Sequence, residues 1–91
     1  MNVQAEISLY PLRTADLAQA IEVFLGELKA AGLWVQTGNM SSTVAGDVEA
    51  VFSTVGTAFK AAAKNNQVVM VMKVSNACPS SSVGAVAEIP E

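Results

Sequence analysis

The sequence contains no histidine and one cysteine, Cys78. A single cysteine cannot form an internal disulfide, and without histidine the chain lacks the commonest general base and a frequent zinc ligand. A metal-dependent hydrolase and a histidine-activated nucleophile are therefore both unexpected. We expect a protein that is not an enzyme, with no catalytic residue, no bound metal and no cofactor.

Charge is also scarce. Charged residues make up 14% of the 91 residues, hydrophobic residues make up 52%, and the net charge is −3. Arg13 is the only arginine, so few groups are available to neutralise phosphates, and we expect no nucleic-acid partner. A small soluble monomer usually carries more surface charge than this, which favours a homo-oligomer.

Long apolar runs are missing as well, and we expect no secretory leader. No apolar run approaches the length that spans a membrane, and the start, MNVQAEISLYPL, lacks the basic, apolar and small-residue sections of a signal peptide. We therefore expect a cytoplasmic protein with no membrane partner. The length fits a single domain, which we place at residues 1–79, followed by a loop and C-terminal tail at residues 80–91.

The sequence does contain clear strand patterns. Apolar and polar residues alternate from Val3 to Tyr10, which predicts a strand buried on one side, and we expect Pro11 to end it because proline cannot donate to a ladder. Further strands are predicted at residues 33–37, 42–45 and 67–75, with GNMS as the hairpin connection between the second and the third.

Two apolar stripes at helical spacing predict two helices. The first is expected to be capped by Thr14, with Asp16 in its first turn, and to end at Gly32 in the left-handed conformation. The second is expected to open at Gly46 and Asp47 and to break at KNNQ. The stripes consist of Leu17, Ile21, Phe24, Leu25 and Leu28 in the first helix, and of Val48, Val51, Phe52, Val55 and Phe59 in the second.

The resulting order, βαββαβ, predicts a ferredoxin-like α+β sandwich, in which a four-stranded antiparallel sheet carries both helices on one face. The other face stays uncovered, and the alternation in each strand predicts which side chains it displays. This mixed apolar and polar surface suits a protein interface with a ligand pocket in it. The side chains expected there are Gln4, Glu6, Ser8, Tyr10, Trp34, Gln36, Val69, Val71, Lys73 and Ser75.

Three segments, EISLYPL, GNMSSTVAGDVEAVF and VVMVMKVSNACP, resemble the YkoF-like thiamine-binding family of ferredoxin-like proteins. The resemblance covers residues 3–79. A Gly-x-x-x-Thr-Thr-x-x-Gly motif of that family is matched by Gly38, Ser42, Thr43 and Gly46. Two departures are Ser42, where threonine is common, and Ala45, which replaces an acidic residue. If that carboxylate contacts the ligand, its loss weakens binding or favours another heterocycle.

The resemblance implies a non-enzymatic protein that binds thiamine or its hydroxymethylpyrimidine part. It also implies that a chain with one repeat forms a homodimer or homotetramer through its sheets, with the pocket near that interface. The alternative is a structural or regulatory oligomerisation domain that has no small-molecule ligand.

The candidate ligand-binding residues lie in the first strand, the second strand and the hairpin. Glu6 is expected to pair with a ring amine or a cationic ring, or else with an interface group. Trp34 is expected to stack on the ligand or to anchor the interface. The hairpin hydroxyls could instead serve the turn and the entry to the second helix. The full candidate set is Glu6, Ser8, Trp34, Asn39, Ser42 and Thr43.

Overall fold

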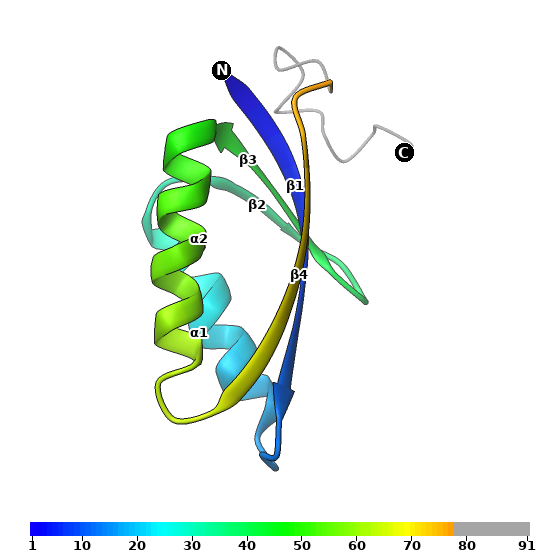
Figure 1. The fold of residues 1–91 in the computed structure, drawn as a ribbon, viewed down its shortest axis with the longest axis vertical. Coiled ribbons are helices and arrows are strands. Elements are labelled where there is room, and N and C mark those ends of the chain that lie inside the picture. Colours follow the sequence, from blue (N-terminus) through cyan, green and yellow to red (C-terminus); the bar gives the residue numbers. More distant parts are fainter. Residues whose placement is uncertain (78–91) are drawn as a thin grey trace.

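The computed structural model describes residues 1–77 and has the predicted ferredoxin-like α+β architecture (Figure 1). The four strands form one antiparallel sheet in the order β2-β3-β1-β4, and both helices cover the same face of it. Cys78 and the predicted tail at residues 80–91 lie outside the described residues. The elements are β1 (Asn2–Leu12), α1 (Leu17–Ala30), β2 (Trp34–Thr37), β3 (Ser42–Asp47), α2 (Val48–Ala62) and β4 (Gln67–Ser75).

Strand β1 runs past Pro11, which was expected to end it. Pro11 lies within the strand, opposite Val68 of β4, and pairing with β4 continues to Leu12. Pairing with β3 stops earlier, at Ile7. Beyond Ile7 the strand therefore has a neighbour on one side only, and an edge position tolerates a residue that has no N–H group.

Helix α1 begins later than the sequence pattern indicated. Asp16, rather than Thr14, is the N-cap, and its carboxylate accepts a hydrogen bond from the Gln19 N–H at 3.2 Å. The Thr14 hydroxyl instead accepts from the Asp16 N–H at 3.1 Å and so shapes the turn before the helix. The predicted left-handed residue after α1 is confirmed, because Gly32 has φ 84°.

Helix α2 begins at Val48, and Asp47 is its N-cap. Gly46 was expected to open this helix but is part of β3, opposite Val3. A methyl group at position 46 would come within 2.8 Å of the Leu33 Cδ2 atom, so the glycine allows a close approach between β3 and the chain that leads into β2. Neither helix within residues 1–77 is long and apolar enough to span a membrane.

The core lies between the helices and the inner face of the sheet. Phe24, Leu28, Val44 and Val51 are its largest fully buried side chains. The predicted stripes are only partly correct, because the side chains of Leu17 and Phe52 remain 50% and 52% exposed. Leu17 is exposed because it is the first residue of α1. Phe52 follows the buried Val51 in sequence, so its side chain projects to one side of the buried face of α2. That buried face consists of Val51, Val55, Ala58 and Ala62.

We call the sheet face away from the helices the open face. The alternation argument assigned its residues correctly, because the register brings Gln36, Thr43, Glu6 and Lys73 into one row across all four strands. Apolar side chains on it are well exposed, with Tyr10 at 49%, Val69 at 46% and Val71 at 52%. The open face therefore combines a polar row with exposed apolar side chains.

Candidate functional site

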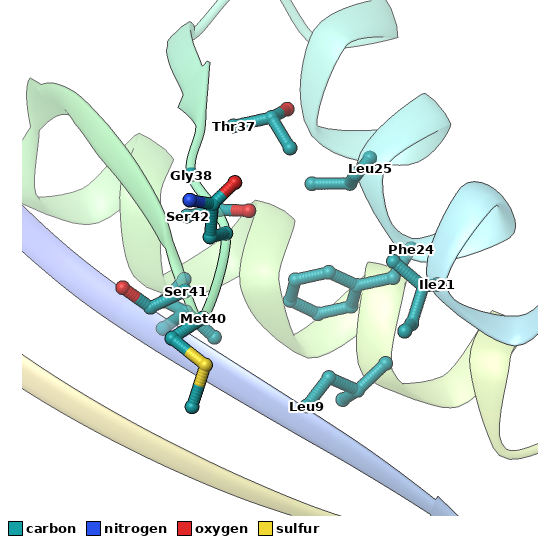
Figure 2. Close-up of a pocket in the computed structure, with 11 residues that line it drawn as sticks. Leu9, Ile21, Phe24, Leu25, Thr37, Gly38, Met40, Ser41 and Ser42 are labelled. Carbon is teal, nitrogen blue, oxygen red and sulfur yellow. The ribbon is translucent and has the colours of Figure 1, made fainter. Parts of the chain in front are cut away.

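A cavity of about 100 Å³ lies between α1 and the β2–β3 hairpin, on the helix side of the sheet. It lies where β1 continues past Ser42, the first residue of β3, so Leu9 has no β3 residue beside it. Figure 2 shows the ring of Phe24 reaching from α1 toward the hairpin. We call this cavity the hairpin pocket. It is lined by Ile7 and Leu9 of β1, Ile21, Phe24 and Leu25 of α1, and residues 37–42 of the hairpin.

The hairpin wall of the pocket is a tight turn. The last ladder pair is Thr37 opposite Ser42, and the Gly38 N–H donates to the Ser41 carbonyl at 2.8 Å. A Cβ atom at position 38 would lie 2.8 Å from the same carbonyl oxygen. The glycine of the GNMS connection is therefore required for the close backbone approach in this turn.

The pocket combines apolar walls with a polar rim. Its β1 and α1 residues are all apolar, whereas the hairpin contributes the polar residues Thr37, Asn39 and Ser42. Ser42 is nearly buried, at 9% exposure. Hydroxyl and amide groups can donate and accept hydrogen bonds at the edge of a ring whose faces lie against apolar side chains. This arrangement suits a small, flat heterocycle.

Glu6 lies on the other side of the sheet and makes two polar contacts. The Ser41 hydroxyl donates to Glu6 Oε2 at 2.9 Å, and Lys73 Nζ lies 3.2 Å from Glu6 Oε1. The hydrogen bond from Ser41, the hydrogen bond from Lys73 and the charge of Lys73 hold the pKa of Glu6 below its usual value of 4.5. Glu6 is therefore ionised at neutral pH.

The predicted site residues fall into two groups on opposite sides of the sheet. Asn39 and Ser42 line the hairpin pocket. Ser8, Thr43 and Glu6 belong to the open face, where Thr43 is directly opposite Glu6 and the Ser8 hydroxyl donates to the Met40 carbonyl at 3.5 Å.

Trp34 is half-buried on the open face, opposite Ala45, and β3 separates its strand from β1. Trp34 is therefore not a neighbour of Glu6, although the sequence suggested that it was. Because these groups do not converge, one ligand in the hairpin pocket cannot lie between Glu6 and Trp34.

Sequence reasoning missed the apolar part of the pocket. Ile21, Phe24 and Leu25 belong to the helical stripe, where a pocket wall and a core residue give the same pattern. A usable signal was the difference in strand length. The sequence predicted a first strand of residues 3–10 and a third strand of residues 42–45, so part of the first strand had to lack a neighbour on that side.

A second hollow, of about 460 Å³, lies at the end of the molecule where β1 leaves the sheet and β4 enters it. It is lined by Leu12, Arg13 and residues 63–67, which bring two cations and three amides but little apolar surface. Such a lining does not suit a flat apolar ring. The part of the chain that the structure describes also brings together no group of His, Cys, Asp or Glu residues able to hold a metal ion.

Comparison with known proteins gives one family and several solved structures. The YKOF-related family matches residues 2–81. A protein of Streptococcus pneumoniae has a TM-score of 0.82 at 15% identity, with 98% of this chain and 100% of that chain covered. A hypothetical protein of Methanocaldococcus jannascii has a TM-score of 0.79 at 21% identity, with 97% and 98% covered.

A third solved structure comes from Thermotoga maritima, from a protein whose proposed role is thiamine biosynthesis or salvage. Its TM-score is 0.74 at 17% identity, with 82% of this chain and 83% of that chain covered. No curated protein is significantly similar to this chain. At these identities the solved structures support the fold alone.

Proposed function

Since this chain belongs to the YKOF-related family, we propose that it is a non-enzymatic protein that binds thiamine or its hydroxymethylpyrimidine part in the hairpin pocket. The observation that carries the proposal is the pocket itself, with apolar walls from β1 and α1 and a polar rim from the hairpin. The role proposed for the Thermotoga maritima protein of the same fold supports the choice of thiamine.

The pyrimidine ring is the part of thiamine that fits this pocket. It is flat, and its amine and ring nitrogens need hydrogen-bond partners at their edges, which Asn39 and Ser42 can supply. A cavity of about 150 Å³ in another protein holds benzene. The hairpin pocket, at about 100 Å³, is smaller than that cavity, so it has room for one ring at most, and only if its wall moves outward; the thiazolium then stays outside.

The open-face residues of the predicted site then serve a contact between copies of the chain. Tyr10, Val69 and Val71 expose enough apolar surface to favour a sheet-to-sheet contact, and Trp34 extends that surface at the β2 edge. In this arrangement Glu6, Ser8 and Thr43 form the polar part of the contact. The assembly is a homodimer or a homotetramer.

A thermal-shift series tests the ligand, with thiamine, hydroxymethylpyrimidine, the thiazole half and thiamine diphosphate at a fixed protein concentration. A ligand at about one hundred times its dissociation constant adds about 2.7 kcal/mol to the free energy of unfolding, which raises the midpoint of a small domain by about ten degrees or more. We expect this shift with thiamine and with hydroxymethylpyrimidine, and none with the thiazole half.

A variant that fills the pocket tests whether the ligand that causes the thermal shift binds there. Ile21→Trp places a larger side chain in the pocket wall and should abolish the shift, whereas Val23→Trp, on an exposed part of the same helix, should keep it. Circular dichroism is the control that checks whether both variants are folded. If the parent shows no shift at millimolar ligand while remaining a clean oligomer, the chain is a structural or regulatory oligomerisation domain instead.

A further inference from the structure

We infer that Glu6 is a positioning residue: through Ser41 it holds the β2–β3 hairpin against β1 from the open face and thereby sets the wall of the hairpin pocket on the opposite face. The inference rests on the proposed function of that pocket. It assigns Glu6 a role in binding without any contact between its carboxylate and the ligand.

The first observation is that few bonds hold the hairpin. Residues 38–41 lie beyond both ladders, which end at Ser42. Within residues 1–77, the hydrogen bonds that link this turn to β1 are those from Ser41 to Glu6, at 2.9 Å, and from Ser8 to the Met40 carbonyl, at a long 3.5 Å. Packing adds little at the tip, because Met40 is 87% exposed. The Glu6 bond is therefore the stronger of the two links.

The second observation is that Ser41 belongs to both surfaces. Ser42 faces the helices opposite Ile7, whereas the Ser41 hydroxyl donates to Glu6 and so lies toward the open face. In Figure 2 the Ser41 hydroxyl points away from the ring of Phe24, although Ser41 also lines the pocket. A displacement of this one residue therefore changes the pocket wall.

The third observation is that Glu6 is itself fixed in place. It lies in the middle of the sheet, where Thr43 of β3 and Lys73 of β4 are its direct cross-strand neighbours and Gln36 of β2 continues the row. Lys73 is the only other charged side chain in that row, and its ammonium contacts the second carboxylate oxygen at 3.2 Å. One oxygen of Glu6 is thus held by β4 while the other accepts from the hairpin.

The test uses a double-mutant cycle on thiamine affinity, measured by titration calorimetry. Glu6→Ala and Ser41→Ala should each weaken binding about threefold, the size expected for one exposed charge-assisted contact. Because both changes break the same link, the double variant should bind no more weakly than the weaker single variant. If the two losses multiply, Glu6 acts on the ligand independently of Ser41, and the inference is wrong.

Lys73→Met is the matched control, because it removes the ion pair on the open face but leaves the bond from Ser41 to Glu6. Its affinity for thiamine should fall less than that of Glu6→Ala, because the bond from Ser41 to Glu6 remains and β1 stays paired with both neighbouring strands. If Lys73→Met weakens binding as much as Glu6→Ala does, the effect comes from the charge of the open face or from a contact between copies. That result would overturn the inference, and light scattering on each variant would show whether the assembly changed.

A measurement without ligand separates this inference from the proposed function. Amide hydrogen exchange at residues 38–42 should be faster in Glu6→Ala and in Ser41→Ala than in the parent, and should change less in Lys73→Met than in either of these variants. If the parent fails to bind thiamine but exchange follows this pattern, the proposed ligand is wrong and the positioning role stands. If exchange at the hairpin is the same in Glu6→Ala and in the parent, Glu6 does not hold the hairpin.

Discussion

Asp47 ends β3 and caps α2, so one side chain fixes the junction between two elements. Its carboxylate accepts a hydrogen bond from the Glu49 N–H at 3.1 Å and contacts the N-terminal amine at 3.4 Å. The bond from Glu49 is the main reason that the pKa of Asp47 lies below its usual value of 3.8, and the amine adds to the effect.

This depressed pKa predicts an acid-sensitive part of the stability. A carboxyl group whose pKa is lower in the folded chain stabilises the fold above its unfolded-state pKa, and the stabilisation is lost as the pH falls through the folded-state pKa. For Asp47 the loss begins near pH 3.8 and continues below it, and for Glu6 it begins near pH 4.5. The unfolding midpoint should therefore decline as the pH falls from about 5 to 2.

Asp47→Asn provides the comparison, since asparagine can cap a helix but does not titrate. Midpoints measured by circular dichroism should fall less steeply with acidification for Asp47→Asn than for the parent. Identical slopes would mean that the Asp47 carboxylate gains nothing from ionisation in the folded chain.

At the scale of the elements, both helices carry a glycine on an exposed surface. Gly26 of α1 and Gly56 of α2 are exposed, and an added Cβ atom would meet nothing within 4 Å at either position. Glycine within a helix lowers the free energy of unfolding by about 0.5–1 kcal/mol relative to alanine, because glycine loses more conformational freedom on folding than alanine does.

Gly26→Ala and Gly56→Ala should therefore each raise the free energy of unfolding by about 0.5–1 kcal/mol, and the double variant by about the sum. Urea denaturation measures the free energy of unfolding of the parent, the single variants and the double variant. Gly38→Ala is the opposite control, because its Cβ atom would lie 2.8 Å from the Ser41 carbonyl oxygen, and it should destabilise the chain. A loss of stability at position 26 or 56 would show that these glycines have a role that the structure does not reveal.

The elements also show how far the sequence could predict the fold. Element order and the bounds of β4 were predicted correctly, because their apolar residues repeat at clear periods and the breaks at Gly32 and KNNQ are strong. Pro11 was misjudged because whether a proline ends a strand depends on which side has a neighbour, and this is a property of the sheet. Phe52 was misjudged because the buried face of α2 consists of Val51, Val55, Ala58 and Ala62, and the two alanines were not counted in the predicted stripe.

The site was harder to predict than the fold for a related reason. The alternation rule placed Glu6 and Lys73 on the open face correctly, and the hairpin was identified as polar. The contact of Ser41 with Glu6 depends on how a turn outside the ladder bends, which no periodicity encodes. The apolar walls of the pocket could not be predicted, because Phe24 lies on the apolar stripe of α1 in the same way as a core residue does.

For the molecule as a whole, the open face is the side of the sheet that neither helix covers within residues 1–77. Neither helix packs on it, and it displays Tyr10, Val69 and Val71 at close to half of their full exposure. In a chain with 14% charged residues, covering such a surface with a second copy of the chain would remove exposed apolar area from water and stabilise the fold.

The contact proposed for the open face predicts that a charge placed on that face dissociates the assembly. We expect Val71→Asp to convert the parent oligomer to monomers, because burying an unpaired carboxylate in the contact is costly, whereas Val23→Asp on the exposed surface of α1 should leave the assembly unchanged. Light scattering after size-exclusion chromatography distinguishes the two results. A Val71→Asp variant with the mass of the parent would place the contact elsewhere.

Binding of the pyrimidine ring of thiamine in the hairpin pocket is best examined by a nuclear magnetic resonance titration of the labelled protein with thiamine, because this experiment reports ligand contact residue by residue. Such binding predicts shifts concentrated at Ile21, Phe24, Leu25 and residues 37–42, and the same pattern with hydroxymethylpyrimidine alone. Shifts confined to the open face around Trp34 and Val71, or no shifts at saturating ligand, would contradict it.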